Sequence, residues 1–330
     1  MKRSRLLACS MLLALALPAG ALADSSQLRL SDSLDGPDFA PGGGLYYKRN
    51  KEQGAGSATF EVTVEGRRAV ELAVRPQCPG GDTLCSERAE VWERPEVLAG
   101  YDKPVWYAFS MRLDQPVPEI RHRYVMAQWK REIIPGAEGD YSPFLALRLL
   151  DGRLAVTIDT DTGRFEPIGT AERPKACLPG ETPATQPDPY RQFRSLVAVE
   201  PSAAAIDDAG YVGCTADIRV TRRQGVLPAA SSGWIDFVFL TKPGPKGDGR
   251  IEIAANGMWV ATVEGRIGHE GPGLGENQYF KFGPYRAGRD DTWRIFYNNF
   301  RRGPSCTDVA APELCATIAG APVNRIVQQP

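Results

Sequence analysis

Short runs in which hydrophobic and polar residues alternate recur along the chain and predict β-strands. The runs that we expect to be strands cover residues 58–64, 69–74, 105–113, 124–130, 144–149, 154–159, 234–240, 250–255, 258–263, 279–282 and 293–299. Asp151-Gly152 and Asn256-Gly257 lie between such runs and favour tight hairpin turns. Sustained helical periodicity is scarce, and residues 86–93 fit either a strand or a helix. The pattern predicts an all-β fold, a two-sheet antiparallel β-sandwich of the jelly-roll type.

The length of the chain is compatible with one large domain or with two. Its 330 residues include 34 glycines and 27 prolines, which favour many turns over long helices. Residues 166–190 are rich in proline, threonine and glycine and contain Cys177, so we expect a long loop that a disulfide holds in place. We therefore expect one domain over residues 24–330, with a disulfide-pinned loop insertion near 166–215.

The first 23 residues have the pattern of a signal peptide. Lys2, Arg3 and Arg5 precede an apolar run over residues 6–17, and Ala21-Leu22-Ala23 supplies the small residues of a cleavage site. The apolar run is shorter than the roughly 20 residues of a membrane span, and no later segment is long enough. We expect a secreted or periplasmic protein with no membrane partner.

The cysteines agree with export. Without Cys9, six remain, and an even number in an exported chain indicates disulfides, with 15 connectivities to choose from. We expect the pairs that close short Pro/Gly-rich segments, namely Cys78–Cys85, Cys177–Cys214 and Cys306–Cys315. A zinc site is a poor alternative, because the sequence has no C-x-x-C motif and only two histidines.

The overall charge excludes one class of partner. Lysine and arginine total 39 and aspartate and glutamate total 40, which gives a formal net charge of −1. A protein that binds nucleic acid or an anionic membrane over a broad surface is usually basic, so we expect neither partner. Any cationic site must be local.

Three short stretches carry candidate chemistry. In the first, residues 87–93, a strand would place Arg88, Glu90 and Trp92 on one face, where an arginine held by a glutamate can bind a carboxylate. The alternative is a charge pair on the protein surface.

The second stretch is residues 122–130. A period of two places five residues on one face: His122, Tyr124, Met126, Gln128 and Lys130. Polar groups on such a face could line a groove, although a solvated sheet surface is the commoner case.

The third stretch is residues 279–286. Tyr279 and Lys281 share a face, and Gly283-Pro284 must end or bend the strand and present Tyr285 at its exit. The alternative is a core aromatic cluster from which Lys281 extends to solvent.

Together the three stretches resemble the polysaccharide lyases with a concanavalin-like jelly roll, particularly the heparin-lyase-I-like and glucuronan-lyase-like group, and more distantly the alginate lyases. The alginate lyases have R-[ST]-E-L-R, then Q-[IV]-H, then Y-F-K-A-G-x-Y. Arg88-Ala89-Glu90 matches the start of the first motif, Gln128 the start of the second, and residues 279–285 nearly all of the third. The chain departs from the pattern at Lys130, which replaces the histidine, and at Trp92, which replaces the second arginine.

This resemblance implies β-elimination on an acidic, uronate-containing polysaccharide. Gln128, Arg88 and Lys130 would neutralise the uronate carboxylate, and Tyr285 would act as the acid and also as the base in a syn elimination, with Lys281 as its neighbouring cation. His122 and His269 are the alternative bases. The candidate substrate-binding residues are Glu90, Trp129, Arg131, Arg286 and Tyr279. The chemistry requires no metal or organic cofactor; a structural Ca²⁺ is compatible with the sequence but not indicated by it. We expect a monomer.

Two other classes of protein use the same scaffold. A retaining glycoside hydrolase needs two carboxylates about 5–5.5 Å apart, but Glu87 and Glu93 are six residues apart and no E-x-D-x-x-E motif occurs. A non-catalytic module that binds an anionic glycan would use groove aromatics such as Trp92, Trp129 and Trp259, and would not need Tyr285 or Gln128.

Overall fold

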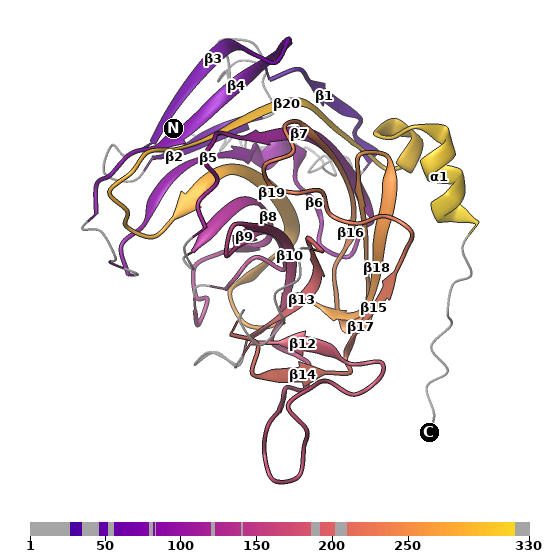
Figure 1. The fold of residues 1–330 in the computed structure, drawn as a ribbon. Coiled ribbons are helices and arrows are strands. Elements are labelled where there is room, and N and C mark those ends of the chain that lie inside the picture. The colour runs from indigo at the N-terminus through magenta and orange to yellow at the C-terminus, as the bar shows by residue number, and fades with distance from the viewer. Residues whose placement is uncertain are drawn as a thin grey trace, which may run out of the picture.

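Two antiparallel β-sheets packed face to face make up the fold (Figure 1). The computed structural model describes residues 27–34, 46–51, 56–78, 82, 84–119, 123–139, 141–185, 192–201 and 210–320. The two-sheet sandwich expected from the alternating pattern is therefore confirmed. The predicted signal peptide lies outside the described residues, and no helix within them is long and apolar enough to cross a membrane.

The first sheet forms the outer layer of the sandwich. Its strand order is β15-β18-β17-β16-β7-β20-β4-β3, and β1 pairs with β20. In chain order the strands are β1 (Leu30–Asp32), β3 (Gly56–Val64), β4 (Arg67–Val74), β7 (Val105–Leu113), β15 (Ile218–Arg222), β16 (Ile235–Lys242), β17 (Gly244–Ala255), β18 (Met258–Ile267) and β20 (Trp293–Gly303).

A short helix covers part of the outer face of this sheet. Helix α1 (Pro312–Ala319) packs Leu314 and Ile318 against Trp106 and Leu240, and the Cys306–Cys315 disulfide ties it to the 3-10 helix η4 (Cys306–Asp308). The sequence analysis did not predict this helix. Its eight residues are too few to show a clear helical period.

The second sheet curves inside the first (Figure 1), and its free face carries the groove described below. The strand order is β11-β14-β12-β13-β10-β9-β8-β19-β5-β2, and β6 pairs with β19. In chain order the strands are β2 (Tyr46–Lys51), β5 (Glu87–Glu93), β6 (Ala99–Gly100), β8 (Tyr124–Ile133), β9 (Leu145–Leu150), β10 (Arg153–Thr160), β11 (Glu166–Pro167), β12 (Thr182–Ala184), β13 (Phe193–Val199), β14 (Gly213–Thr215) and β19 (Leu274–Arg286). A 3-10 helix, η2 (Pro95–Val97), follows β5.

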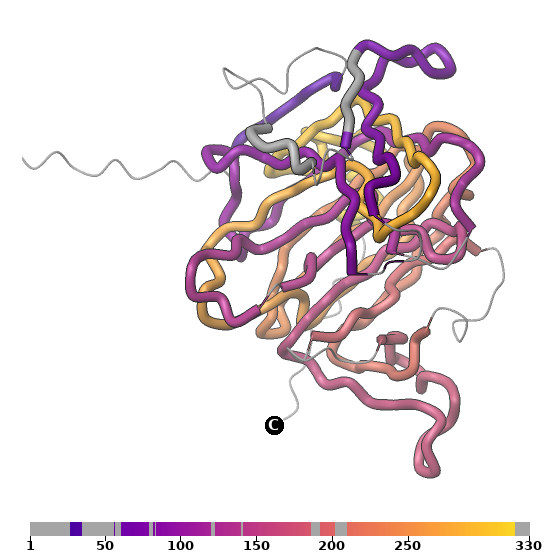
Figure 2. Tube along the Cα trace, turned by 90° about the vertical axis from the view of Figure 1, so that its left-hand side faces the viewer, coloured from indigo at the N-terminus to yellow at the C-terminus, as the bar shows by residue number. Residues whose placement is uncertain are grey.

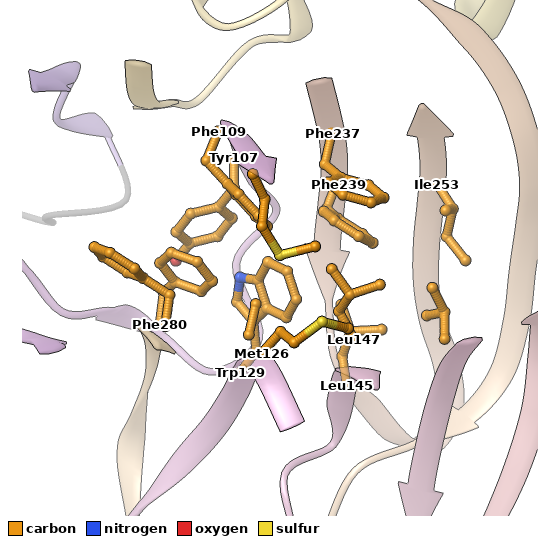
Figure 3. Close-up of a cluster of buried hydrophobic side chains, with 14 of the residues drawn as sticks. Tyr107, Phe109, Met126, Trp129, Leu145, Leu147, Phe237, Phe239, Ile253 and Phe280 are labelled. Carbon is orange, nitrogen blue, oxygen red and sulfur yellow. The ribbon is translucent and has the colours of Figure 1, made fainter. Parts of the chain in front are cut away.

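The hydrophobic core lies between the two sheets and is rich in aromatic rings (Figure 3). Trp129 from β8 lies with its ring centroid 4.7 Å from Phe239 of β16 and 4.7 Å from Phe280 of β19. Tyr107 and Phe109 of β7 pack on the same cluster. Offset and tilted ring pairs of this kind stabilise a fold beyond the area that they bury. The core therefore fixes β8 and β19, the two strands that carry most of the candidate residues.

All eleven predicted strands are present, and most of them are longer than predicted. The two predicted hairpin turns are also confirmed, since Asp151-Gly152 and Asn256-Gly257 adopt the left-handed backbone conformation that such turns require. Residues 86–93, which fitted either state, contain strand β5. The sequence analysis missed β13, which runs beside β10 on the groove side of the second sheet.

The segment between β10 and β13 extends away from the body of the sandwich (Figures 1 and 2). Its described part contains the short strands β11 and β12 at the end of the second sheet, and the Cys177–Cys214 disulfide joins it to β14. The other predicted pairs, Cys78–Cys85 and Cys306–Cys315, are also present. The expected disulfides are therefore confirmed. That residues 24–330 form one domain stays a prediction.

Candidate active site

A groove of about 720 Å³ runs over the free face of the second sheet, across β5, β19, β8, β9 and β13. Two of its described lining residues are acidic, Glu93 and Glu132, and six are cationic: Arg88, Arg123, Lys130, Arg148, Arg194 and Lys281. A concave site lined by excess positive charge attracts anionic ligands. In a chain whose net charge is close to zero, positive charge is therefore concentrated in this groove.

The strand register brings the first and third sequence stretches together. Lys281 of β19 pairs with Trp92 of β5 on one side and with Gln128 of β8 on the other. Four residues further along β19, Tyr285 pairs with Arg88 of β5. Side chains in such rows stand about 5 Å from their neighbours on the same face.

Glu90 is the buried centre of this cluster. Its carboxylate accepts hydrogen bonds from the Gln128 Nε2 and from the Lys281 Nζ, the latter at 3.1 Å, and lies 3.8 Å from the Arg88 guanidinium. Burial lowers the pKa of Lys281 to about 8, an effect that the Glu90 carboxylate opposes and that Lys130 and Arg88 reinforce. Glu90 therefore lies beneath the groove, where it orients the amide and the ammonium group and does not line the surface.

Two guanidinium groups lie close to the ring of Tyr285. Arg88 lies 3.9 Å and Arg123 4.9 Å from the centre of its ring. Tyr285 lies on the same face of β19 as Lys281, because the two are four residues apart and the pairing with β5 continues to Arg286 without a shift of register. Gly283 has φ +122°, and a Cβ at this position would lie 2.1 Å from the carbonyl oxygen of Ala89. Only glycine fits there.

Two aromatic rings form one end of the groove. Trp92 stacks on Tyr279 with ring centroids 5.5 Å apart, and the Nζ of Lys281 lies 4.5 Å from the Trp92 ring. Tyr279 pairs in register with Lys130, which also lines the groove. Flat, partly buried rings of this kind provide a surface on which a sugar ring can pack.

The residues of the second stretch do not all lie on one face of the sheet, although their period of two predicted that they would. A register shift between Val125 and Ala127 interrupts the alternation on β8. Gln128 and Lys130 line the groove, as predicted, whereas Met126 is packed in the hydrophobic core, and Tyr124 packs in the core and also borders the groove. The prediction that these residues share one face is wrong because the bulge adds one residue to the strand.

Besides Glu90, three of the five predicted substrate-binding residues do not line the groove. Trp129 points into the core between the sheets and is fully buried (Figure 3). Arg286 is also fully buried, where it pairs with Glu87 at 2.6 Å. Arg131 donates hydrogen bonds of 2.7 Å to the carbonyl oxygens of Gly275 and His269. These three assignments are wrong, because each side chain lies on the opposite face from Gln128 and Lys281 or is engaged by the loops.

His269 does not reach over the groove as its glycine-rich loop suggested. Its ring is fully buried, and Nε2 is 2.9 Å from the Ser142 carbonyl oxygen, to which it donates in the neutral tautomer. Burial lowers the pKa of His269 to about 4. The ring packs behind Tyr141, which does line the groove. The other candidate base, His122, lies outside the described residues.

The carboxylates that a glycoside hydrolase would need are occupied elsewhere. Glu87 is fully buried against Arg286, and Glu93 is paired with Arg302 at 3.1 Å. Glu87 and Glu93 therefore do not form the pair of carboxylates across the groove that a retaining glycoside hydrolase needs.

Among the groove residues that sequence reasoning missed are Arg123, Arg148, Arg194 and Tyr211. Arg148 carried a signal that could have been used, because it is the one charged residue in the apolar strand Leu145–Leu150. Arg194 lies on β13, which was not predicted. The remaining two lie outside regular strands, where the sequence gives no period to read.

One group of described residues has the spacing of a metal site, but it lies outside the groove. Cys177 and Cys214 are disulfide-bonded, so only Glu181 of this group can offer an anionic ligand. The groove residues are amide, phenol and cationic groups, which suit a carboxylate better than a metal ion. That the chemistry needs no cofactor stays a prediction.

Comparison with known proteins decides the class. The family model described as polysaccharide lyase matches residues 43–301. The chain belongs to this family. It is therefore an enzyme that acts on a polysaccharide, and the glycoside-hydrolase and binding-module alternatives are set aside. A search of curated proteins finds no match to this lyase.

Of the similar solved structures, the glucuronan lyase, with a TM-score above 0.5, supports the fold of this lyase. An endo-β-1,4-glucuronan lyase from the fungus Trichoderma reesei is similar at 15% identity and a TM-score of 0.51, over 85% of this chain and 97% of that chain. An alginate lyase of polysaccharide lyase family 7 aligns at 12% identity and a TM-score of 0.36, over 77% and 83%. The binding domain of botulinum neurotoxin DC aligns at 10% identity and a TM-score of 0.36, over 76% and 42%. The predicted jelly-roll fold is confirmed.

Proposed function

We propose that this lyase cleaves a uronate-containing acidic polysaccharide by β-elimination and leaves 4,5-unsaturated ends. The observation that carries the proposal is the Gln128–Glu90–Lys281 cluster beside Tyr285, on a groove with six cationic residues. Amide and cationic groups held by a buried carboxylate suit the recognition of a second carboxylate, that of the sugar.

The groove residues would first make the C5 proton removable. That proton is a very weak acid, and its removal places negative charge on the neighbouring carboxylate. Gln128, Arg88 and Lys130 are the groups that we assign to this charge. Donors positioned in this way act mainly in the transition state, and loss of one typically lowers the rate by about 100- to 1,000-fold.

Tyr285 would then move the proton. As the phenolate it takes the proton from C5, the electrons of the C5–H bond form the C4=C5 double bond, and the C4–O bond breaks with its electrons on the glycosidic oxygen. Tyr285, now a phenol, returns the proton to that oxygen, so charge and atoms balance within one sugar linkage. The positive charges of Arg88 and Arg123 beside the ring would stabilise the negative charge on the phenolic oxygen.

The excess of cationic residues in the groove supports an acidic polymer as the substrate class. Glucuronan, heparin-like chains and alginate all present carboxylates to such a groove. The fold similarity to a glucuronan lyase and the shared Tyr279–Tyr285 motif support a polyuronate as the first polymer to test.

We also propose that the lyase acts outside the cytoplasm. The three disulfides support export because such bonds persist in oxidising compartments. Fractionation of cells that produce the full chain, with the N-terminus of the product determined, tests this. A product that begins at Asp24 and lies outside the cytoplasm is expected.

The reaction class is tested by product analysis. Elimination gives a fragment with a C4=C5 double bond that absorbs in the ultraviolet and is one water lighter than the product of hydrolysis. Purified protein is incubated with glucuronan, alginate, heparin and hyaluronan, and the masses of the fragments are measured. Fragments that all carry the added water would overturn the proposal.

A further inference from the structure

Arg148 is a nearly buried charge without a carboxylate partner among the described residues. It is 7% exposed, and its Nε donates a 2.9 Å hydrogen bond to the hydroxyl of Thr157. Arginines buried to this extent are almost always paired with an acidic group, because the charge loses its hydration. One hydroxyl does not balance it.

The nearest carboxylate is already committed. Asp159 accepts two hydrogen bonds from Arg194, at 3.0 and 2.9 Å, in the bidentate geometry that uses both of its oxygens. One negative charge therefore faces two guanidinium groups. Burial and the positive charge of Arg194 lower the pKa of Arg148 to about 9, an effect that Asp159 opposes. This part of the groove has an excess of positive charge.

Arg148 lies on the same face of the sheet as Tyr285. Tyr285 pairs with Val125 on β8, and Val125 pairs with Arg148 on β9. Two strand spacings separate the backbones of Tyr285 and Arg148, a distance of about 10 Å. Arg148 and Arg194 both line the groove, beyond β8 as seen from Trp92.

We propose that Arg148, beside Arg194, forms a second anion-binding subsite for an acidic group on a sugar next to the one that is cleaved. The inference rests on the proposed function, which places the cleaved sugar at Gln128 and Tyr285. The planar guanidinium matches the two oxygens of a carboxylate and equally those of a sulfate. The subsite selects chains that carry acidic groups on consecutive sugars over chains in which uronates alternate with neutral sugars.

Binding without turnover tests this subsite. The Tyr285→Phe variant is titrated by calorimetry with two hexasaccharides, one made only of uronates and one in which uronates alternate with neutral N-acetylated sugars. Arg148→Gln in the same background is expected to weaken binding of the first by about 10- to 100-fold and of the second by less than about threefold. Arg148→Lys, which keeps the charge and loses the planar fork, is expected to fall between.

The acidic group on the neighbouring sugar is identified by a third probe. This is the alternating hexasaccharide with sulfated amino sugars. If Arg148→Gln weakens its binding as much as that of the polyuronate, the subsite accepts sulfate, and if only the polyuronate is affected, the subsite is specific for carboxylate. Both results support a second anion-binding subsite.

Controls separate this role from a structural one. Arg164→Gln removes an exposed arginine away from the groove and is expected to change neither affinity. Three results would each overturn the inference. They are equal losses of affinity for the polyuronate and for the alternating oligosaccharide, no loss of affinity for either, and no binding of either by the Tyr285→Phe parent. If Arg148→Gln does not fold, the affinities of the Tyr285→Phe parent, which retains Arg148, and of its Arg148→Lys derivative are compared instead.

The inference and the proposed function can fail separately. An Arg148-dependent preference for the polyuronate, with no unsaturated product from the unmutated chain, would contradict the elimination and leave the subsite standing. Unsaturated product from the unmutated chain, with no such preference, would do the opposite.

Discussion

The Nζ of Lys281, which lines the groove, lies 3.1 Å from a carboxylate oxygen of Glu90, which lies beneath it, and both side chains are buried. The other oxygen of Glu90 accepts a hydrogen bond from Gln128. A carboxylate that no substrate can reach therefore sets the positions of two groups that we assign to the substrate. This arrangement, and the position of Trp129 in the core and not in the groove, have measurable consequences for stability, binding and activity.

Glu90→Gln is expected to lower the free energy of unfolding by about 3–5 kcal/mol, because it leaves the Lys281 ammonium buried without its counter-charge. The double variant Glu90→Gln/Lys281→Met removes both charges and is expected to regain part of this loss. Denaturant unfolding at neutral pH measures both. Glu96→Gln, which removes the exposed partner of Arg94, is the control and should change stability by less than about 1 kcal/mol. A loss in Glu90→Gln no larger than in the control contradicts the account.

The activity is expected to fall as the pH rises through about 8, where Lys281 loses its proton and its charge. Lys281→Arg keeps the charge at higher pH, so the alkaline decline should move upward in this variant. The pH profile of kcat/KM measures this. An alkaline decline at the same pH in both proteins would show that another group titrates.

The stability of the fold should change in the opposite direction over the same range. The pKa of Lys281 in the folded state, about 8, lies below its ordinary value of 10.5, so the unfolded chain binds more protons between these values. The contribution of Lys281 to stability therefore rises with pH from about 8 to 10.5. Comparison with Lys281→Met by unfolding at pH 7.5 and 9.5 isolates this contribution. A falling contribution would contradict the burial of a charged Lys281.

Trp92 lies on β5 and Trp129 on β8, on either side of β19, and their substitution should have different effects. Trp92→Ala removes a groove ring stacked on Tyr279 and is expected to weaken oligosaccharide binding by about 3- to 10-fold. Trp129→Ala opens a cavity in the core and is expected to cost about 3–5 kcal/mol of stability. Calorimetry and denaturant unfolding of both variants test the pair. Equal destabilisation would show that Trp92 is also a core residue.

The strands and part of the site could be predicted because alternation is a local property of the chain. Arg88, Gln128 and Lys281 were found in this way, and the register of β5, β19 and β8 brings them together. The face of Met126 could not be predicted, because one inserted residue in a strand leaves no mark in the hydrophobic pattern.

The wrongly assigned arginines show a second limit. Arg286 is engaged by Glu87, which lies 199 positions earlier in the chain, and Arg131 by the carbonyl oxygen of His269. A sequence shows that an arginine is present and does not show whether a distant segment already occupies it. Arg148 is the converse case, a charge in an apolar strand that the fold leaves without an acidic partner among the described residues.

The central claim is that Tyr285 carries out β-elimination on a polyuronate. The most direct measurement is the ultraviolet absorbance of a polyuronate solution over time, with the unmutated lyase and with Tyr285→Phe, each checked for oligosaccharide binding. We expect a steady rise with the unmutated lyase and a rate at least about 100-fold lower with Tyr285→Phe, whose binding is retained. Cleavage without a rise in absorbance, or an undiminished rise with Tyr285→Phe, would contradict the claim.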